Sequence, residues 1–407
     1  MTGEAVGAPA AKRPPPEGVA NDEPLELSVV MPCLNEADTL ATCIRKAQSA
    51  MADHGISGEV VVADNGSTDG SQTIAASLGA RVVHVAARGY GSALMGGIVA
   101  ARGRYVLMGD ADDSYDFAEL PGFVEKLREG NDLVQGCRLE SGGGRVLAGA
   151  MPFLHRRWGN PMFSSAARAW FGAPIHDVYC GMLAFTTDHY ASLDQRCTGM
   201  EFATEMIVKS SLRRARIAEV PITLHPDGRR SHSPHLRTFR DGWRTLRFFL
   251  VYSPRWLFLV PGALLILAGL VGYSLALPRV TALGVTFDAH TLLFASLSMI
   301  CGYQAALFGL LSKVFAVGEG LLPPDARIKR LTRQLTLERA LVLATVVMVL
   351  GVLLLLLAVL EWRSRDFGRL DYADTMRLVI PGVTLTALGF QSILSAFFIS
   401  VLALARR

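Results

Sequence analysis

Four carboxylates stand within nine residues in the segment GDADDSYDF at 109–117, directly after an apolar run typical of a buried strand. One residue separates Asp110 from Asp112, so in an extended chain their side chains point the same way. Such a pair can hold Mg²⁺ or Mn²⁺, which joins carboxylates to the oxygens of a diphosphate and neutralises charge on a leaving phosphate. The spacing therefore predicts a metal and diphosphate site. A calcium loop is excluded, because Tyr115 and Pro121 stand where that loop requires Gly and Glu.

The residues from 25 to 233 alternate between short apolar runs and segments with helical spacing. The β-branched runs predict strands at 27–33, 59–64, 80–85 and 104–110, and the segments between them predict helices, for example at 37–51 and 92–101. This alternation is typical of an α/β domain with a Rossmann-like, mostly parallel sheet and helices on both faces. Ligands bind such sheets outside the carboxyl ends of the strands.

Polar residues follow three of these predicted strands. Glu36 follows the first, Asp64 ends the second and Asp110 ends the fourth, so three carboxylates are expected to meet in one crevice. Each strand end alone could also be an ordinary turn or helix cap, as with Ser67 and Asp69. The phosphate-binding loop GxxxxGK and the dinucleotide fingerprint GxGxxG after a first strand are missing. These observations favour a nucleotide-diphosphate substrate held by a metal.

Five segments carry a resemblance to a known family: MPCLNEADTL, VVVADNGSTDGS, ARGYGSALMGGIVAARGRYVLMGDADD, VQGCRLESGGG and MEFATEM. Their ordered series, over roughly residues 27 to 250, resembles family 2 glycosyltransferases of the GT-A fold. The polyprenyl-phosphate branch, typified by dolichyl-phosphate mannose and glucose synthases, is the most similar. The resemblance implies an inverting, metal-dependent transfer of one sugar from a UDP- or GDP-sugar to polyprenyl phosphate.

The resemblance also assigns roles to residues of this sequence. It implies that the nucleotide is bound by Pro32, Asn35, Glu36, Asp64, Asn65, Ser67, Asp69 and Gly91. It places Asp110 and Asp112 on the metal, Asp113 and Glu201 near the sugar, and Arg138 and Glu205 among the catalytic residues. The family often continues its acidic motif with Leu-Gln or Leu-Ser, whereas this chain has Asp113 and Ser114. A third protein ligand to the metal at Ser114 is therefore left open.

The acceptor in this branch is a phosphate monoester, which is largely dianionic at neutral pH because its second pKa is about 6. Such a nucleophile needs no general base, but it needs cations beside the anionic donor, and the planar fork of arginine suits phosphate oxygens. The resemblance and the position of the arginines favour Arg138, Arg157 and Arg230 as ligands of the acceptor phosphate. Arg157 could also be a charge on a helix surface, and Arg230 a contact to lipid headgroups.

The C-terminal part contains four apolar stretches, at about 256–277, 291–312, 340–360 and 378–404. Each has the roughly 20 residues that a helix needs to cross a bilayer. They predict a transmembrane domain over 256–407, after a catalytic domain at 25–233 and an amphipathic interfacial helix at 234–255. The first 24 residues, rich in Ala, Pro and Gly, predict a disordered tail.

Basic residues between the second and third stretches place the 313–339 loop and the catalytic domain in the cytoplasm. The 361–377 loop weakens this assignment, because it holds four arginines among four acidic residues. We expect a multi-pass protein of the plasma membrane, whose spans anchor the domain, guide the lipid or form a homo-oligomer. Nucleic acid is not an expected partner, since the net charge is only +4 and the basic residues cluster beside the membrane.

The sequence leaves two alternative functions open. A processive polysaccharide synthase is expected to carry Gln-x-x-Arg-Trp, but Leu154 and Tyr252 stand where the Gln belongs before the two Arg-Trp pairs. A transporter or lipid flippase with a regulatory nucleotide-sugar-binding domain would be favoured by charges inside the spans, which hold mainly Gln304 and Gln391 as polar residues. The six cysteines contain no CxxC pair, so a thiolate metal site is not predicted.

Overall fold

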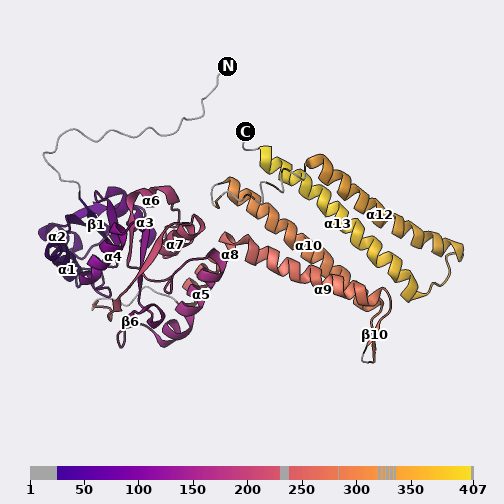
Figure 1. The fold of residues 1–407 in the computed structure, drawn as a ribbon, viewed down its shortest axis with the longest axis horizontal. Coiled ribbons are helices and arrows are strands. Elements are labelled where there is room, and N and C mark those ends of the chain that lie inside the picture. The colour runs from indigo at the N-terminus through magenta and orange to yellow at the C-terminus, as the bar shows by residue number, and fades with distance from the viewer. Residues whose placement is uncertain are drawn as a thin grey trace, which may run out of the picture.

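The structure of the chain is a computed structural model that describes residues 25–229, 238–282, 284–319, 322–323, 326, 330, 333 and 336–404 (Figure 1). The predicted tail at 1–24 and the predicted phosphate ligand Arg230 lie outside these residues. The described chain forms an N-terminal α/β domain followed by long helices, as the sequence predicts.

A seven-stranded sheet in the order β3-β2-β1-β4-β7-β5-β8 forms the centre of the N-terminal domain. Its strands are β1 (Leu27–Cys33), β2 (Gly58–Asp64), β3 (Arg81–His84), β4 (Tyr105–Met108), β5 (Leu133–Cys137), β7 (Leu183–Thr186) and β8 (Ile217–Pro221). All neighbours are parallel except β7, which is antiparallel to both β4 and β5. The mostly parallel sheet that the sequence predicts is therefore confirmed. A separate pair is formed by β6 (Arg145–Val146) and β9 (Thr223–Leu224).

Helices cover both faces of this sheet, because successive side chains of a buried strand point to opposite sides. On β1, Leu27, Val29 and Met31 belong to one hydrophobic cluster and Val30 to the other. The first cluster includes α1 (Leu40–Asp53) and α4 (Leu120–Arg128). The second includes α3 (Tyr90–Ala100), α5 (Asn160–Phe171), α7 (Phe202–Leu212) and α8 (Thr238–Tyr252). The shorter helices α2 (Ser71–Ser77) and α6 (Thr187–Leu193) complete the domain.

The described part of the predicted interfacial helix is α8, which carries both buried and exposed aromatic side chains. Phe249 is fully buried and packs edge-on against Phe163 and Phe171 of α5, and Phe248 is buried beside it. Trp243 of the same helix is exposed. The helix thus uses one side to pack on the N-terminal domain, an alternative that amphipathic spacing alone cannot separate from a membrane contact.

Four helices of the described chain are long and apolar enough to cross a membrane, which matches the four predicted spans. They begin with the π-helical turn η4 (Arg255–Leu259) and α9 (Val260–Ala276), followed by α10 (Ala289–Gly318), α12 (Leu337–Ser364) and α13 (Tyr372–Leu404). In Figure 1 they form two hairpins beside the N-terminal domain, α9 with α10 and α12 with α13. The strands β10 (Thr281–Ala282) and β11 (Val285–Thr286) form a small turn between α9 and α10.

Candidate active site

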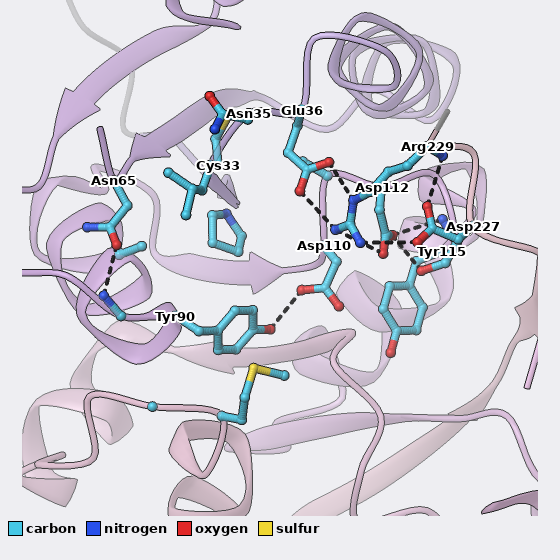
Figure 2. A pocket seen from close by; sticks show the side chains of 18 of the residues that line it. Cys33, Asn35, Glu36, Asn65, Tyr90, Asp110, Asp112, Tyr115, Asp227 and Arg229 are labelled. Atoms are coloured by element: carbon cyan, nitrogen blue, oxygen red, sulfur yellow. Dashed lines mark hydrogen bonds and ion pairs between the residues drawn. The ribbon is translucent and has the colours of Figure 1, made fainter. Parts of the chain in front are cut away.

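A cavity of about 1060 Å³ opens outside the carboxyl ends of β1, β2 and β4, where the parallel sheet predicts a ligand site (Figure 2). Its wall includes the predicted residues Pro32, Asn35, Glu36, Asn65, Asp110, Asp112 and Arg138. It also includes residues for which the sequence analysis proposed no role, among them Arg88, Tyr90, His155, Met200, Asp227, Arg229 and Arg244.

The two predicted metal ligands lie together in this cavity. Asp110 accepts a hydrogen bond from the Tyr90 hydroxyl at 2.8 Å (Figure 2). Burial, and next the negative charge of Asp112, raise the pKa of Asp110 to about 7. Asp112 Oδ1 accepts hydrogen bonds from the backbone N–H of Ser114 at 3.0 Å and from its hydroxyl at 2.6 Å. Ser114 therefore orients Asp112, a role that the sequence analysis did not foresee.

A buried arginine joins this pair to the end of the first strand. The guanidinium of Arg229 donates to both carboxylate oxygens of Glu36, each at 2.8 Å, and lies 3.3 Å from Asp112 (Figure 2). A third carboxylate, Asp227, lies 3.1 Å from the same guanidinium. Burial opposes the charged form of Arg229, but these carboxylates outweigh it and raise the pKa of Arg229. One cation is thus shared by three acids.

The donor set at Asp110 and Asp112 fits a divalent metal. The pKa of Asp110 is raised by burial and by the neighbouring charge of Asp112, so the negative charge of this pair is incompletely neutralised although Arg229 lies beside Asp112. Within the described ranges no group of three or more His, Cys, Asp or Glu side chains forms a complete metal cage. Mg²⁺ commonly takes only one or two protein carboxylates and completes its shell with water and substrate phosphates. The protein therefore offers half of such a site.

Asparagines shape the opposite end of the cavity. Asn65 donates from Nδ2 to the carbonyls of Val85 and Ala87, and its Oδ1 accepts from the backbone N–H of Gly89 at 2.8 Å. Asn35 has a positive φ of 61° and its Oδ1 accepts from the N–H of Thr68 at 2.8 Å. These bonds fix the loops after β1, β2 and β3 around the space predicted for the nucleoside.

Three predicted nucleotide ligands lie behind this wall and hold its loops. Asp64 is buried and accepts from the N–H groups of Gly66 and Ser67. The Ser67 hydroxyl accepts from the N–H of Asn35, and Asp69 accepts from that of Ala37. In the structure these three side chains hold the loops by accepting from backbone N–H groups, and α2 begins without a side-chain cap. A direct contact to nucleotide stays a prediction.

Gly91, predicted to bind the nucleotide, lies against a loop and is not among the residues of the cavity wall. A Cβ at this position would lie 2.4 Å from the carbonyl oxygen of Cys197 and 3.0 Å from that of Gly199. Gly199 and its neighbour Met200 line the cavity. The missing side chain thus permits the close approach of α3 to the loop that closes one side of the site.

We expect Gly91→Ala to push this loop outward, lowering the free energy of unfolding by about 1–3 kcal/mol and raising the KM for the nucleotide sugar. The checks are thermal melting of the detergent-solubilised protein and steady-state kinetics. Gly122→Ala is the matched control, since its Cβ would meet Val220 at an ordinary 3.4 Å. Equal melting temperatures and KM values for the two variants would contradict the packing role.

Arg138 reaches the cavity, but a buried carboxylate holds most of its guanidinium. Its Nε and one terminal nitrogen donate to the two oxygens of Asp177 at 2.7 and 2.9 Å. The other terminal nitrogen lies 3.5 Å from the hydroxyl of Tyr115, which in turn accepts from the N–H of Gly181. One edge of the predicted phosphate ligand is therefore committed to Asp177, and the remaining terminal nitrogen is next to Tyr115, which also lines the cavity.

Glu205 lies outside the cavity wall, contrary to the catalytic position expected for it. Its Oε2 accepts from the N–H groups of Arg196 and Cys197, and its Oε1 contacts Lys209 at 2.7 Å and the Tyr252 hydroxyl at 3.3 Å. These bonds outweigh the opposing effect of burial and lower the pKa of Glu205. Glu205 ties α7, α8 and the 196–197 turn together.

Three further predicted ligands of the sugar or acceptor, Asp113, Glu201 and Arg157, are also outside the wall. Asp113 has a positive φ of 60° and pairs with Lys46 at 2.9 Å, and Glu201 lies 3.9 Å from Arg244. Arg157 is exposed on the turn η3 (His155–Gly159). The cations that the structure brings into the wall from the C-terminal side of the domain are Arg229 and Arg244.

The hydrogen bond from Tyr90 to Asp110 should influence how the reaction rate depends on pH. This hydrogen bond lowers the pKa of Asp110, so Tyr90→Phe should raise that pKa further above its present value of about 7. A bond to a charged group contributes about 1.5–3 kcal/mol, which corresponds to a shift of roughly one unit or more. A protonated Asp110 binds a cation poorly, so the acid limb of kcat/KM at limiting metal should move to higher pH.

The measurement is a kcat/KM profile against pH for wild type and Tyr90→Phe, since this parameter reports ionisations of the free enzyme. Tyr190→Phe is the control, because Tyr190 stacks on Phe185 away from the cavity wall. An unchanged acid limb in Tyr90→Phe, or an equal shift in the control, would contradict the proposed effect.

Comparisons with known proteins agree with this geometry. Residues 28–193 match the family described as Glycosyl transferase family 2, and residues 310–403 match the Glycosyltransferase family 2 C-terminal transmembrane region. The low-salt glycan biosynthesis hexosyltransferase Agl6 of Haloferax volcanii is 38% identical over 378 residues, covering 92% of this chain and 89% of that protein. The dolichyl-phosphate hexose transferase of the same organism is 32% identical over 198 residues, covering 48% of this chain and 82% of that protein.

Among solved structures, glucosyl-3-phosphoglycerate synthase from Mycobacterium tuberculosis, in complex with Mn²⁺, UDP and phosphoglyceric acid, is similar with a TM-score of 0.45 and 23% identity. The similarity covers 56% of this chain and 78% of that one. The matches to family 2 extend over the sheet domain and over the last two spans, and the identity to the hexosyltransferase continues over nearly the whole chain. The chain therefore belongs to glycosyltransferase family 2, as a multi-pass membrane protein whose N-terminal domain has the GT-A fold.

Proposed function

We propose that this glycosyltransferase transfers one sugar from a UDP- or GDP-sugar to polyprenyl phosphate, giving a polyprenyl-phosphate β-sugar for cell-envelope or glycan assembly. An acceptor phosphate oxygen attacks the anomeric carbon and forms the new bond. The bond from that carbon to the diphosphate breaks on the opposite side, and the nucleoside diphosphate leaves. One displacement of this kind inverts the anomeric configuration.

The observation that carries this proposal is the composition of the cavity. Asp110 and Asp112 lie together in its wall, and Arg138, Arg229 and Arg244 lie in the same wall. Acids alone repel a diphosphate, and arginines alone do not explain a pair of acids that lie together in the wall. A site that binds two phosphorylated substrates beside a metal needs both kinds of group.

Asp110 and Asp112 would hold the metal, Mg²⁺ or Mn²⁺. When bound, this ion supplies positive charge to the diphosphate of the donor and to the leaving nucleotide. Ser114 orients Asp112 through its hydroxyl, and Tyr90 orients Asp110. The nearby guanidinium of Arg229 adds charge that remains fixed when the products leave.

A phosphate acceptor also agrees with the protonation chemistry of the site. An acceptor dianion needs no proton removed. A sugar-hydroxyl acceptor would need a base, and the buried acid Glu205 lies outside the wall and is bonded by protein groups. Four helices that are long and apolar enough to cross a membrane follow the domain. They would hold the domain at the membrane in which a polyprenyl acceptor resides. The relative named as a dolichyl-phosphate hexose transferase is consistent with such a lipid.

We place the reaction on the cytoplasmic side of the plasma membrane. The basic residues between the second and third spans, which include Lys313, Arg327, Lys329, Arg330 and Arg333, favour a cytoplasmic loop at that end. The N-terminal domain precedes the first span and therefore lies on the same side as this loop. Nucleotide sugars made in the cytoplasm would then reach the cavity directly.

The test is sugar transfer by the purified full-length protein in proteoliposomes that contain polyprenyl phosphate. A panel of radiolabelled UDP- and GDP-sugars is supplied with Mg²⁺ or Mn²⁺, and label is counted in the organic extract. We expect one donor to give a lipid that releases a monosaccharide on mild acid treatment. Labelled polymer, or no transfer from any donor in protein that remains folded, would contradict the proposal.

A further inference from the structure

A strip of apolar side chains is exposed beside the mouth of the cavity. Phe153, Leu154, Trp158 and Met162 are 68%, 63%, 73% and 60% exposed. They occupy a single stretch of chain from the start of the helical segment at 153 through η3 into α5. Four large apolar groups so close together are unusual on a surface that faces only water, and they indicate an interaction site.

The same helix connects this strip to the first membrane span. Trp170, near the end of α5, stacks on Trp256 of η4 with ring centroids 5.5 Å apart. Trp256 lies at the start of the span Arg255–Ala276, where tryptophan typically occupies the interface between membrane and water. In Figure 1, α5 lies on the side of the N-terminal domain that faces the spans, next to α8.

The packing between α5 and α8 keeps this orientation rigid. Phe163 and Phe171 of α5 both contact the fully buried Phe249 of α8, at centroid distances of 6.1 and 5.2 Å. Trp243, also exposed, follows Gly242, whose position lies against the ring of Phe163. The exposed apolar side chains of α5 and α8 therefore lie close together. The other end of α5 contacts Trp256 at the start of the first span.

The charges around the strip suit a bilayer surface. Arg157 and Arg247 are exposed on these two segments, and Arg255 is exposed at the start of the span. Apolar side chains flanked by arginines are the composition of elements that lie in the headgroup region, particularly of membranes with anionic lipids. A second copy of this chain would gain less from such a patch, because like charges would face each other.

We propose that Phe153, Leu154, Trp158 and Met162 insert into the headgroup and upper acyl region of the bilayer that the spans cross. Pro152 and His155, which lie within this stretch, line the cavity. The insertion therefore holds the mouth of the cavity at the lipid surface, where a group anchored in the membrane enters without leaving it. The inference concerns the position of the domain and does not depend on the transfer reaction.

The experiment measures depth in the membrane with nitroxide spin labels on the full-length protein in nanodiscs. Cys197 and Cys301, the cysteines that are not buried, are first replaced by Ala. Single cysteines are then introduced and labelled as Phe153→Cys, Leu154→Cys, Trp158→Cys and Met162→Cys. Power-saturation spectra compare collisions with oxygen, which concentrates in the acyl region, and with a water-soluble nickel chelate.

Val99→Cys is the matched control. Val99 is an exposed apolar residue, 81% accessible, near the end of α3. Three residues later, the N–H of Arg102 donates to Ser28 near the start of β1. Val99 therefore lies toward the amino ends of the strands, away from the cavity. Its label should therefore report water in any orientation that keeps the strip in the membrane.

We expect oxygen-to-nickel ratios several-fold above that of Val99→Cys at all four positions, corresponding to a depth of roughly 5–10 Å. Ratios equal to the control would overturn the proposal. Loss of collisions with both reagents, together with spin–spin broadening, would also overturn it, because a second copy of the chain would then cover the strip. These readouts need no substrate, so they stand or fall separately from the transfer assay.

Discussion

Asp112→Asn is expected to abolish nearly all sugar transfer while the protein remains folded. Asn keeps the size of the side chain and can still accept from the Ser114 hydroxyl, which lies 2.6 Å from Asp112 Oδ1. It removes the negative charge that, with Asp110, would hold the metal on the diphosphate. A metal supplies several kcal/mol of charge stabilisation, which corresponds to a loss of about 10²–10⁴-fold in kcat.

The measurement is the initial rate of label transfer to extractable lipid, with donor and metal both saturating. Asp116→Asn is the matched control, because it makes the same substitution four residues away, where the side chain caps the short helix η1 (Phe117–Glu119). Asn is an equally good cap, so this variant should keep wild-type activity and melting temperature. Transfer by Asp112→Asn within tenfold of wild type would exclude a metal role for this carboxylate.

The parts of the site that directly follow regular strands could be predicted from the sequence. Short apolar runs rich in β-branched residues predict the strands, and the parallel order then brings Glu36, Asp110 and Asp112 to one edge. The structure confirms that these three line one cavity. The spans are equally predictable, since length and hydropathy decide them without any knowledge of tertiary contacts.

The predicted site residues that lie outside the cavity wall are those whose side-chain direction or packing depends on backbone geometry outside the strands. Asp113 follows the acidic pair directly, but its positive φ turns it toward Lys46 instead of into the cavity. Glu205 lies on a helix whose buried face meets α8, and helical spacing does not reveal that contact. Gly91 is needed for close packing against Cys197, which is 106 residues away in a separate segment.

The choice between Arg229 and Arg230 illustrates the same limit. Two adjacent arginines in an irregular segment are equivalent in composition, and the sequence analysis favoured Arg230 for the acceptor phosphate. In the structure Arg229 contacts Glu36 and Asp112, although Glu36 lies 193 residues before it in the chain. The pairing of a cation with distant acids is a tertiary contact, and adjacent residues of the same type give no signal for it.

Arg229→Gln is therefore expected to lower both the stability of the domain and the rate of sugar transfer. Arg229 and Glu36 are only 12% and 7% exposed in their side chains, so the substitution removes the guanidinium from beside the buried charge of Glu36. Breaking a buried ion pair in this way costs about 3–5 kcal/mol, equivalent to a melting temperature lower by roughly 10 °C for a domain of this size. Transfer should fall too, because Glu36, Asp110, Asp112 and Asp227 then face the donor diphosphate without Arg229.

A second variant separates the two effects. Glu36→Gln combined with Arg229→Gln removes both charges of the pair, so most of the lost melting temperature should return, whereas transfer should stay low because the cavity still lacks the guanidinium. Arg156→Gln is the control for losing an arginine: its ion pair with Glu140 is largely exposed, and its loss should cost at most about 1 kcal/mol. If the double variant melted no higher than Arg229→Gln, the ion pair with Glu36 would not be the source of the instability. If it recovered transfer together with stability, Arg229 would act only by compensating Glu36, and the positive charge assigned to it at the diphosphate would have to come from another residue.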